Sequence, residues 1–291
     1  MQTLSLFIYT ETSLHAGTGS TVSVVDLPIQ RERITNYPMV QGSGIKGALR
    51  SQANLTKQEE TTLFGPSTED LRNENNKNAR AGAISVGDAR IVLFPIRSLM
   101  GVFAYATCPH VLARLRRDCG QFKLDIPAPA NDESALVTTS SAVMASRSVV
   151  LEEFSFKAQH DAQVDQIAQW LSDKALPEGK EYDYWRKKLL NSLVILPDDA
   201  FRDFVTTSTE IITRVRLDSA KKTVAEGALW TQEALPSDTL LMSRIVLSDR
   251  QNDTPEVAAD SFDRRIQIGG DETTGDGFVA LRWLNHKEEQ S

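Results

Sequence analysis

One carboxylate and a glycine-rich basic segment lie close together near the start of this chain. Asp26 sits in the Pro-containing run Val25-Asp26-Leu27-Pro28-Ile29, ahead of Gly42-Ser43-Gly44-Ile45-Lys46-Gly47. Glycines allow close approach of the backbone, and free N–H groups at the start of a helix attract anions. Lys46 and Arg50 are spaced to share one face of that helix. An acid beside an anion-binding element indicates phosphate chemistry.

The glycine segment also fits the G-x-G-x-x-G pattern of dinucleotide-binding folds, but its surroundings do not. Such a fold needs a strand directly before the glycines and an acidic residue closing a second strand about 20 residues later. Glu59 and Glu60 fall instead in a polar stretch. A stand-alone dinucleotide enzyme is therefore the weaker hypothesis. A glycine turn that serves only helix packing stays open as an alternative.

A second glycine-rich loop lies near the other end of the sequence. Such a loop can wrap a polyanion or simply cap a helix. Its acidic residues oppose bare phosphate binding, which leaves hydroxyl and backbone contacts or a structural role. The candidate contact residues in it are Gly269, Gly270, Thr273, Thr274, Gly275 and Gly277.

His15 follows the first expected strand, where it could serve as a general base. A lone histidine is nevertheless more often a structural group, and a loop aspartate such as Asp26 is usually a turn residue. Neither residue by itself supports an assignment as an enzyme.

The composition is that of a globular protein with an acidic excess. The 291 residues can bury a large core in one elaborated domain or two small ones, and the formal net charge is −7. That charge disfavours a general nucleic-acid binder, because phosphate affinity rests on clustered Lys and Arg. A locally basic groove is still permitted, with a solvated mixture of charges as the alternative. The basic clusters are Arg31, Arg33, Lys46 and Arg50, and Arg97, Arg114, Arg116, Arg117 and Lys123.

The cysteines and the apolar runs indicate in which compartment of the cell the protein is expected. Cys108 and Cys119 have no second pair that would complete a zinc site, so we expect buried, reduced thiols. The N-terminal run has no basic leader and is broken at Thr10 and Glu11, unlike a signal peptide. No window approaches the roughly 20 apolar residues of a membrane span. We expect a cytoplasmic protein without a membrane partner.

Strands and helices are expected to follow one another without regular alternation. This order predicts an α+β fold rather than a doubly wound α/β fold. Residues 56–80 are polar and predict a mobile insertion, whereas 121–150 are expected to be mostly extended. A long hairpin is expected to turn at 218–222. Periodicity predicts strands at 3–10, 84–94, 205–217, 228–235, 239–247 and 278–283, and helices at 43–55, 108–115, 161–171, 182–193 and near 262–265.

Taken together, these segments resemble the RAMP superfamily of CRISPR proteins, and within it the repeated backbone subunits of type III-B effector complexes. The resemblance covers nearly the whole chain. One departure is Asp276, where relatives commonly have a basic residue between the last two glycines. The segments that carry the resemblance are Leu14 to Gly19, Val25 to Glu32, Pro38 to Arg50, Leu63 to Gly65, Ala81 to Leu99, Thr107 to Pro109, Thr213 to Asp218, Glu226 to Trp230, Glu233 to Pro236 and Ile268 to Gly277.

The resemblance implies a single domain over 1–291. It would have a ferredoxin-like palm, similar to an RNA-recognition motif, with helical insertions and a projecting β-hairpin thumb. The implied bounds are about 1–55, 81–120 and 239–291 for the palm, 56–80 for the polar insertion, 121–200 for the extended and helical insertions, and 211–235 for the thumb.

The resemblance also implies a ribonucleoprotein subunit of antiviral defence. Copies would stack into a helical filament along a guide RNA, beside other Cmr-type subunits. The thumb would wedge into the duplex of guide and single-stranded target RNA, and Asp26 would promote cleavage beside it with a divalent metal, expected to be Mg²⁺. His15, Glu226 and Glu233 are weaker candidates for assisting this endoribonuclease. A non-catalytic filament subunit is the alternative.

Guide RNA would contact both glycine-rich segments and the thumb. Lys46 and Arg50, with the turn from Gly42 to Gly47, would hold its phosphates. The residues implied in RNA binding are Gly42, Ser43, Gly44, Lys46, Gly47, Arg50, Gly269, Gly270, Thr273, Thr274, Gly275, Gly277 and Trp230.

Overall fold

The computed structural model describes residues 2–20, 24–67, 81–217, 224–248, 262 and 264–285. Side chains are not described at 217 and 224–227. The turn expected at 218–222 and most of the insertion expected at 56–80 lie outside the described residues. Within this part of the chain, the prediction of strands and helices without regular alternation is confirmed.

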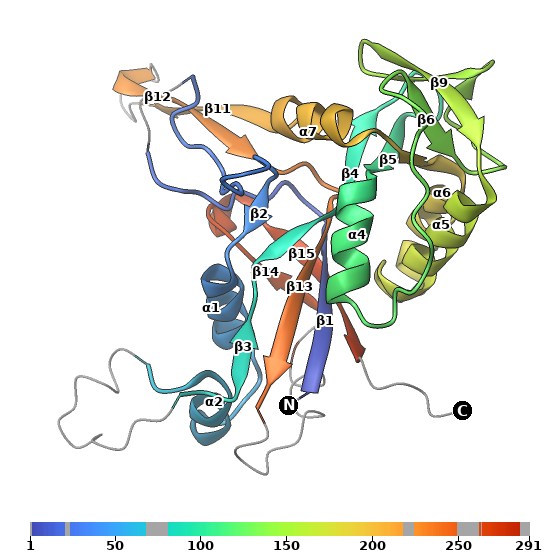
Figure 1. Cartoon of the computed structure of the whole chain (residues 1–291). Coiled ribbons are helices and arrows are strands. Elements are labelled where there is room, and N and C mark those ends of the chain that lie inside the picture. Colours follow the sequence, from blue (N-terminus) through green and yellow to red (C-terminus); the bar gives the residue numbers. More distant parts are fainter. Residues whose placement is uncertain are drawn as a thin grey trace.

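A large mixed sheet runs through the molecule (Figure 1). Its strands lie in the order β14-β15-β1-β13-β4-β5-β10-β6-β9-β8-β7, while β2 pairs with β4 and β3 pairs with β13. The strands of the first half are antiparallel neighbours. They are β1 (Gln2–Thr10), β2 (Met39–Val40), β3 (Ile84–Val86), β4 (Ala89–Arg97), β13 (Leu240–Leu247), β14 (Arg265–Gln267) and β15 (Phe278–Asn285).

β1 is buried on both faces of this sheet. Leu6 and Ile8 face one hydrophobic core, while Phe7 and Tyr9 face a second core on the opposite side. Successive side chains of a strand point to opposite faces, so β1 contributes buried side chains to both cores. The alternation expected from the sequence is present, and Phe7 belongs to a second buried layer.

Helices cover each face of the sheet. On the first core lie α1 (Gly42–Gln52), through Ile45 and Leu49, and α7 (Asp198–Thr207), through Phe201. On the second core lie α4 (Pro109–Asp118), α5 (Ala162–Lys174) and α6 (Asp183–Ser192). The other strands of the sheet are β5 (Phe103–Thr107), β6 (Ser134–Val137), β7 (Met144–Ala145), β8 (Ser148–Leu151), β9 (Phe154–His160) and β10 (Leu193–Ile195).

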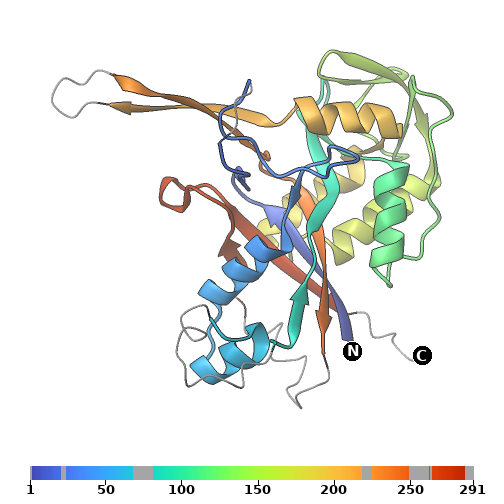
Figure 2. The same cartoon turned by 60° about the vertical axis from the view of Figure 1, so that its left-hand side comes forward.

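A two-stranded antiparallel hairpin forms a sheet of its own. β11 (Glu210–Leu217) pairs with β12 (Val224–Ala234), and Thr213 lies opposite Thr231. Figure 2 shows the two strands projecting from the body of the molecule. The long hairpin expected from the sequence is confirmed, apart from its turn.

Three local expectations were wrong. The helix expected near 262–265 is absent from the described residues there; Arg265–Gln267 instead forms the edge strand β14, because Ile266 and Ile268 alternate into the core. The strand expected from 205 begins only at Glu210, because α7 continues to Thr207. The polar insertion begins with a helix, α2 (Lys57–Phe64), stabilised by a capping box.

That capping box satisfies backbone groups that a helix start would otherwise leave free. Thr56 Oγ1 accepts a bond from the Glu59 backbone N–H, and the Glu59 carboxylate accepts one from the Thr56 N–H. The strand expected at 84–94, with a bulge at Gly87, is divided at Gly87 and Asp88 into β3 and β4, which both pair with β13; one extra residue is inserted between their registers. Both cysteines are buried and free, as expected.

Candidate nucleic-acid interface

The base of the hairpin positions the loop that carries Asp26. The Leu27 N–H donates to the Thr231 carbonyl over 3.1 Å, and the Glu233 N–H donates to the Leu27 carbonyl over 2.9 Å. Leu27 and Gln232 thereby form a parallel bridge. The Pro-containing loop is therefore fixed to the edge of β12 that β11 leaves open.

Asp26 is held by one residue of β12. The Thr231 backbone N–H donates to Asp26 Oδ2 over 2.7 Å, and Thr231 Oγ1 lies 2.9 Å from the same oxygen. These bonds, the backbone one first, lower the pKa of the Asp26 carboxyl. Asp26 is exposed, and both bonds end on Oδ2. An ionised carboxylate therefore lies at the hairpin base, and within the described part of the chain its Oδ1 accepts no hydrogen bond from another residue.

Glu233 is two residues further along β12 and has a different environment. Its side chain is buried; Oε1 accepts bonds from Arg31 over 2.5 Å and from Thr209 over 2.8 Å. Oε2 accepts a bond from the Ile29 N–H over 3.0 Å. Both oxygens are thus used to hold the segment after Asp26 against β12.

His15 lies between β12 and the second glycine-rich loop. Its Nδ1 is 2.6 Å from the Glu233 carbonyl oxygen, and its own carbonyl accepts a bond from the Gly270 N–H over 3.0 Å. The histidine is 9% exposed. The structure therefore brings His15 and Glu233 together at the hairpin base. The side chain of Glu226 lies outside the described residues.

The glycines that begin α1 divide into two groups. A Cβ on Gly42 would lie 2.3 Å from the Val86 carbonyl oxygen, so this position must be glycine for the helix to pack. The Gly42 N–H donates to Asp88 Oδ1 over 2.8 Å. Ser43, Gly44 and Gly47 are exposed. A Cβ added at Gly44 or at Gly47 would have no atom of the described residues within 4 Å beyond its own helix and chain neighbours. α1 therefore presents a face of small residues to solvent.

Lys46 and Arg50 share one face of α1, as their spacing predicts, and that face is partly covered. Arg50 Nε pairs with Glu60 of α2 over 2.6 Å, and Lys46 Nζ is 3.5 Å from the Ile84 carbonyl oxygen. Burial, and then the charge of Arg50, lower the pKa of Lys46. The two cations therefore already have partners within the fold.

The second glycine-rich loop, residues 269–277, is bonded to side chains from both strands of the hairpin base. Arg214 of β11 pairs with Asp276 over 2.5 Å, and Gln232 of β12 donates to Asp271 over 2.5 Å. Two of the acids that oppose phosphate binding are thereby occupied. The exposed residues of the loop include Gly269, Gly270, Thr273 and Thr274, while Gly275 is half-buried and Gly277 is buried.

The sequence and the fold of this chain match known proteins over nearly the whole chain. The family model described as the RAMP superfamily matches residues 7–280. This chain belongs to the RAMP superfamily. Its sequence is 38% identical over 288 residues to "CRISPR system Cmr endoribonuclease Cmr4" of Pyrococcus furiosus. That match covers 94% of this chain and 93% of the Pyrococcus protein.

Other relatives agree with this RAMP assignment. "CRISPR system CMR subunit Cmr4" of Saccharolobus solfataricus is 28% identical over 311 residues, with 96% of each chain covered. The crystal structure of oligomeric Cmr4 from Pyrococcus furiosus superposes with a TM-score of 0.75, 32% identity and 98% coverage of each chain. A chain of the type III-B Cmr-beta complex bound to cognate target RNA has the same fold, with a TM-score of 0.73, 22% identity and 97% coverage of each chain.

A metal ion at the base of the RAMP hairpin would be held through the single exposed carboxylate of Asp26. Among the described residues, no group of three or more His, Cys, Asp or Glu side chains could hold one. Asp26 fits as a single ligand, because Mg²⁺ commonly takes one or two carboxylates and completes its shell with water and phosphate oxygens.

Thr231, Arg214 and Gln232 were missed by sequence reasoning. Each lies on a hairpin strand and bonds to an acid far away in the sequence: Asp26, Asp276 and Asp271. The alternation of the strands could have placed these side chains on particular faces of the RAMP hairpin. Nothing in the linear pattern identifies the loops that meet those faces. Trp230, expected to contact RNA, is half-buried and lies opposite Arg214 in the hairpin.

Proposed function

We propose that this chain is a backbone subunit of a type III-B Cmr effector complex, which binds guide RNA and cleaves complementary target RNA at regular intervals. The supporting comparison is the 38% identity to a Cmr endoribonuclease over 94% of this chain. The likeness to an oligomeric Cmr4 supports stacking of copies into a filament. Other Cmr-type subunits would complete the particle.

The sheet order supports a ferredoxin-like palm with a thumb. β15, β1, β13 and β4 are consecutive antiparallel strands, and α1 follows β1 in the chain and packs on the first core. We take these elements as the palm and the β11–β12 hairpin as the thumb. The thumb would wedge into the duplex of guide and target, next to the loop that its base holds.

Asp26 carries the proposal for cleavage. It is exposed and ionised, and it lies at the base of a projecting hairpin. RNA cleavage needs few protein groups when the 2′-OH is the nucleophile, because distortion of the strand can align that oxygen with the scissile phosphate. The hairpin would supply the distortion, and Asp26 would fix the group that stabilises the phosphate.

That group is proposed to be a divalent ion, with Asp26 Oδ1 as its protein ligand. When bound, Mg²⁺ would neutralise charge that develops on the phosphate. Thr231 would keep the carboxylate ionised and oriented. His15 and Glu233 would support the loop around Asp26 rather than exchange protons, because their side chains are buried and bonded to neighbouring groups.

The guide strand is proposed to cross the exposed face of α1 and reach the second glycine-rich loop. Gln52 at the end of α1 exchanges two hydrogen bonds with Gln267 of β14, which leads directly into that loop. The hydroxyl groups of Ser43 and Thr273 would then contact phosphates without reading sequence, and Gly44, which has no side chain, would let the strand come close to the helix.

The test is Asp26→Asn in the assembled complex, with target RNA and Mg²⁺. Asparagine keeps an oxygen for Thr231 and loses the charge, so cleavage should fall by at least about 100-fold while guide and target stay bound. Asp203→Asn on α7 makes the same change of charge at an exposed position and should cleave normally. Unchanged cleavage by Asp26→Asn would refute the catalytic assignment.

A structural filament subunit is the second candidate, and the Thr231 bonds favour it specifically. Those bonds also let Asp26 act as a tether between its loop and β12. In that case Asp26→Ala should impair assembly or thermal stability, whereas Asp26→Asn should preserve both assembly and cleavage.

A further inference from the structure

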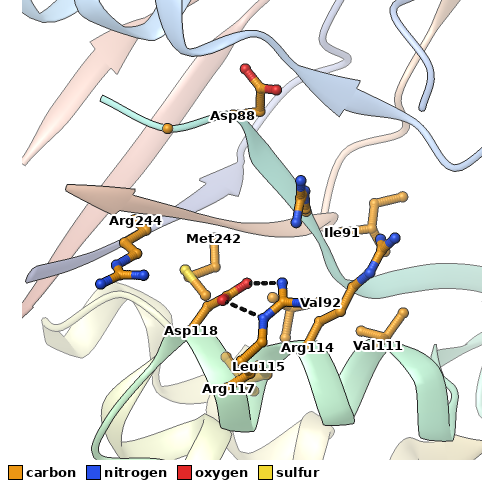
Figure 3. Close-up of a pocket in the computed structure, with 12 residues that line it drawn as sticks. Asp88, Ile91, Val92, Val111, Arg114, Leu115, Arg117, Asp118, Met242 and Arg244 are labelled. Carbon is orange, nitrogen blue, oxygen red and sulfur yellow. Dashed lines mark hydrogen bonds and ion pairs between the residues drawn. The ribbon is translucent and has the colours of Figure 1, made fainter. Parts of the chain in front are cut away.

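A cavity of about 200 Å³ lies on the second core, away from the surface proposed for the guide. It is bounded by the start of β4, by β13 and by α4 (Figure 3). Its apolar floor is formed by Val92, Leu115 and Met242, which belong to the second core. α1 packs on the first core through Ile45 and Leu49. The cavity and α1 therefore lie on opposite faces of the sheet.

Arginines line this cavity. Arg90 Nε and Arg114 Nη1 pair with Glu32 over 3.2 and 2.8 Å, and Arg117 forms two bonds of 2.8 Å with Asp118. Figure 3 shows the Arg117–Asp118 pair beside Arg244. Among the described residues, the Arg244 guanidinium forms no hydrogen bond or ion pair. The pKa of Asp118 is lowered mainly by the hydrogen bonds from Arg117, with a smaller effect from the charge of Arg244.

The charges leave a positive surplus at the cavity. Four arginines and two acids, Asp88 and Asp118, line the cavity, and Glu32 pairs with Arg90 and Arg114 from outside the lining. Counting all three acids against the four arginines leaves a surplus of one positive charge. The whole chain has a formal charge of −7, so this surplus is local. The apolar floor limits solvent on one side, which strengthens attraction of an anion to the arginines.

We propose that this cavity binds a phosphate group of an RNA strand, as a contact separate from α1 and the hairpin. Arg244 supplies the unpaired guanidinium, and Arg117 adds donors from the opposite wall. The planar fork of arginine matches the oxygens of phosphate in a bidentate way. A cavity of about 200 Å³ admits one phosphate and its sugar rather than a protein helix. The inference rests on the proposed RNA-binding function, and it does not require cleavage.

The test measures affinity of the full chain for a labelled single-stranded RNA across a salt series. The variants are Arg244→Gln and the double change Arg117→Gln with Arg244→Gln. Loss of one phosphate contact on a single strand should reduce the slope of log affinity against log salt by about 0.7, and loss of two by about 1.4. We expect Arg244→Gln to weaken binding about threefold to tenfold at low salt, and Arg244→Lys to restore part of it.

Arg202→Gln on α7 is the matched control. Arg202 is exposed, pairs with Asp199 and Asp203, and lies outside the cavity, so the variant makes the same change of net charge. Its slope should equal that of the unaltered chain. Thermal unfolding of each variant checks that the fold is retained.

A competition experiment with inorganic phosphate tests whether the cavity binds the phosphate of RNA or free phosphate. Inorganic phosphate alone should compete only weakly with RNA at the cavity; strong binding of phosphate that depends on Arg244, with RNA affinity unaffected, would overturn the proposal. Equal salt slopes for Arg244→Gln and Arg202→Gln would also overturn it, as would loss of copy-to-copy assembly with unaltered RNA binding. Loss of cleavage in Asp26→Asn is independent of these outcomes, so the two proposals fail separately.

Discussion

At the scale of single residues, the state of each acid is decided by its partners. Asp26 and Glu233 both lie along β12, one held there by Thr231 and the other a residue of the strand itself. Asp26 remains exposed and, among the residues that the structure describes, its carboxylate is bonded to its neighbours through Oδ2 alone, whereas both oxygens of Glu233 accept hydrogen bonds. Asp276, expected to disturb phosphate binding, pairs with Arg214. An acidic side chain is therefore exposed at one position and used in structural bonds at the others.

The variant Thr231→Val should show how much the orientation of the Asp26 carboxylate, apart from its charge, contributes to cleavage. The variant keeps the backbone N–H bond to Asp26 and loses the hydroxyl bond, so the pKa of Asp26 should rise towards its ordinary value. Cleavage by the assembled complex should fall about tenfold because the carboxylate is less well placed. Thr231→Ser should restore both the pKa, measured by NMR titration, and the cleavage rate. A tenfold loss that serine does not restore would contradict a role for the hydroxyl.

At the scale of elements, the base of the hairpin is enclosed by two loops. The Asp26 loop pairs with the open edge of β12, and the second glycine-rich loop is joined to Arg214 and Gln232. Gln52 of α1 forms two hydrogen bonds with Gln267 of β14, directly before the second glycine-rich loop. A displacement of the hairpin would therefore act directly on both loops.

The two kinds of glycine in α1 should respond oppositely to alanine. Gly47→Ala has open space and removes a flexible residue from a helix interior, so it should stabilise the fold by about 0.5–1 kcal/mol. Gly42→Ala places a Cβ against the Val86 carbonyl and should destabilise it by about 1–3 kcal/mol. Chemical denaturation measures both changes. A destabilising Gly47→Ala would mean that this helix face is covered within the chain.

At the scale of the whole molecule, a buried polar group joins the two halves of the sheet. Tyr9 of β1 donates to Asp238, which lies between β12 and β13, and the Tyr9 hydroxyl is 3.2 Å from that of Tyr105 in β5. Burial raises the pKa of Asp238, although the bond from Tyr9 and the charge of Lys188 oppose this effect. The charged form of Asp238 is therefore unfavourable in the folded protein.

This predicts a definite pH dependence. Because the pKa of Asp238 is higher in the folded chain than in the unfolded one, the folded chain binds more protons between the two values. The free energy of unfolding should therefore lose this contribution as pH rises from about 4 through the folded pKa. Asp238→Asn should be relatively more stable, compared with the unaltered chain, at pH 7 than at pH 4.5. Parallel stability curves for the two proteins would contradict the prediction.

Elements with strong local patterns were predictable from sequence. The strand at the start of the chain, α1, α4 and the hairpin follow from periodicity and composition. β14 was predicted as a helix because three residues at an edge are too few to show a period. The end of α7 was taken as strand because the Thr- and Val-rich run from Val205 has strand propensity, while Phe201, Phe204 and Val205 pack into the first core as a helix.

The sequence by itself determined the kinds of chemistry available: one loop carboxylate, two glycine-rich segments and scattered arginines. Only the tertiary structure decided which of them are available, because hydrogen bonds and ion pairs form between residues far apart in the chain. Thr231 binds one oxygen of Asp26, Glu60 occupies Arg50, and α4 and β13 place Arg117 and Arg244 in the lining of the same cavity. Spacing describes neighbours along the chain, whereas availability depends on neighbours in space.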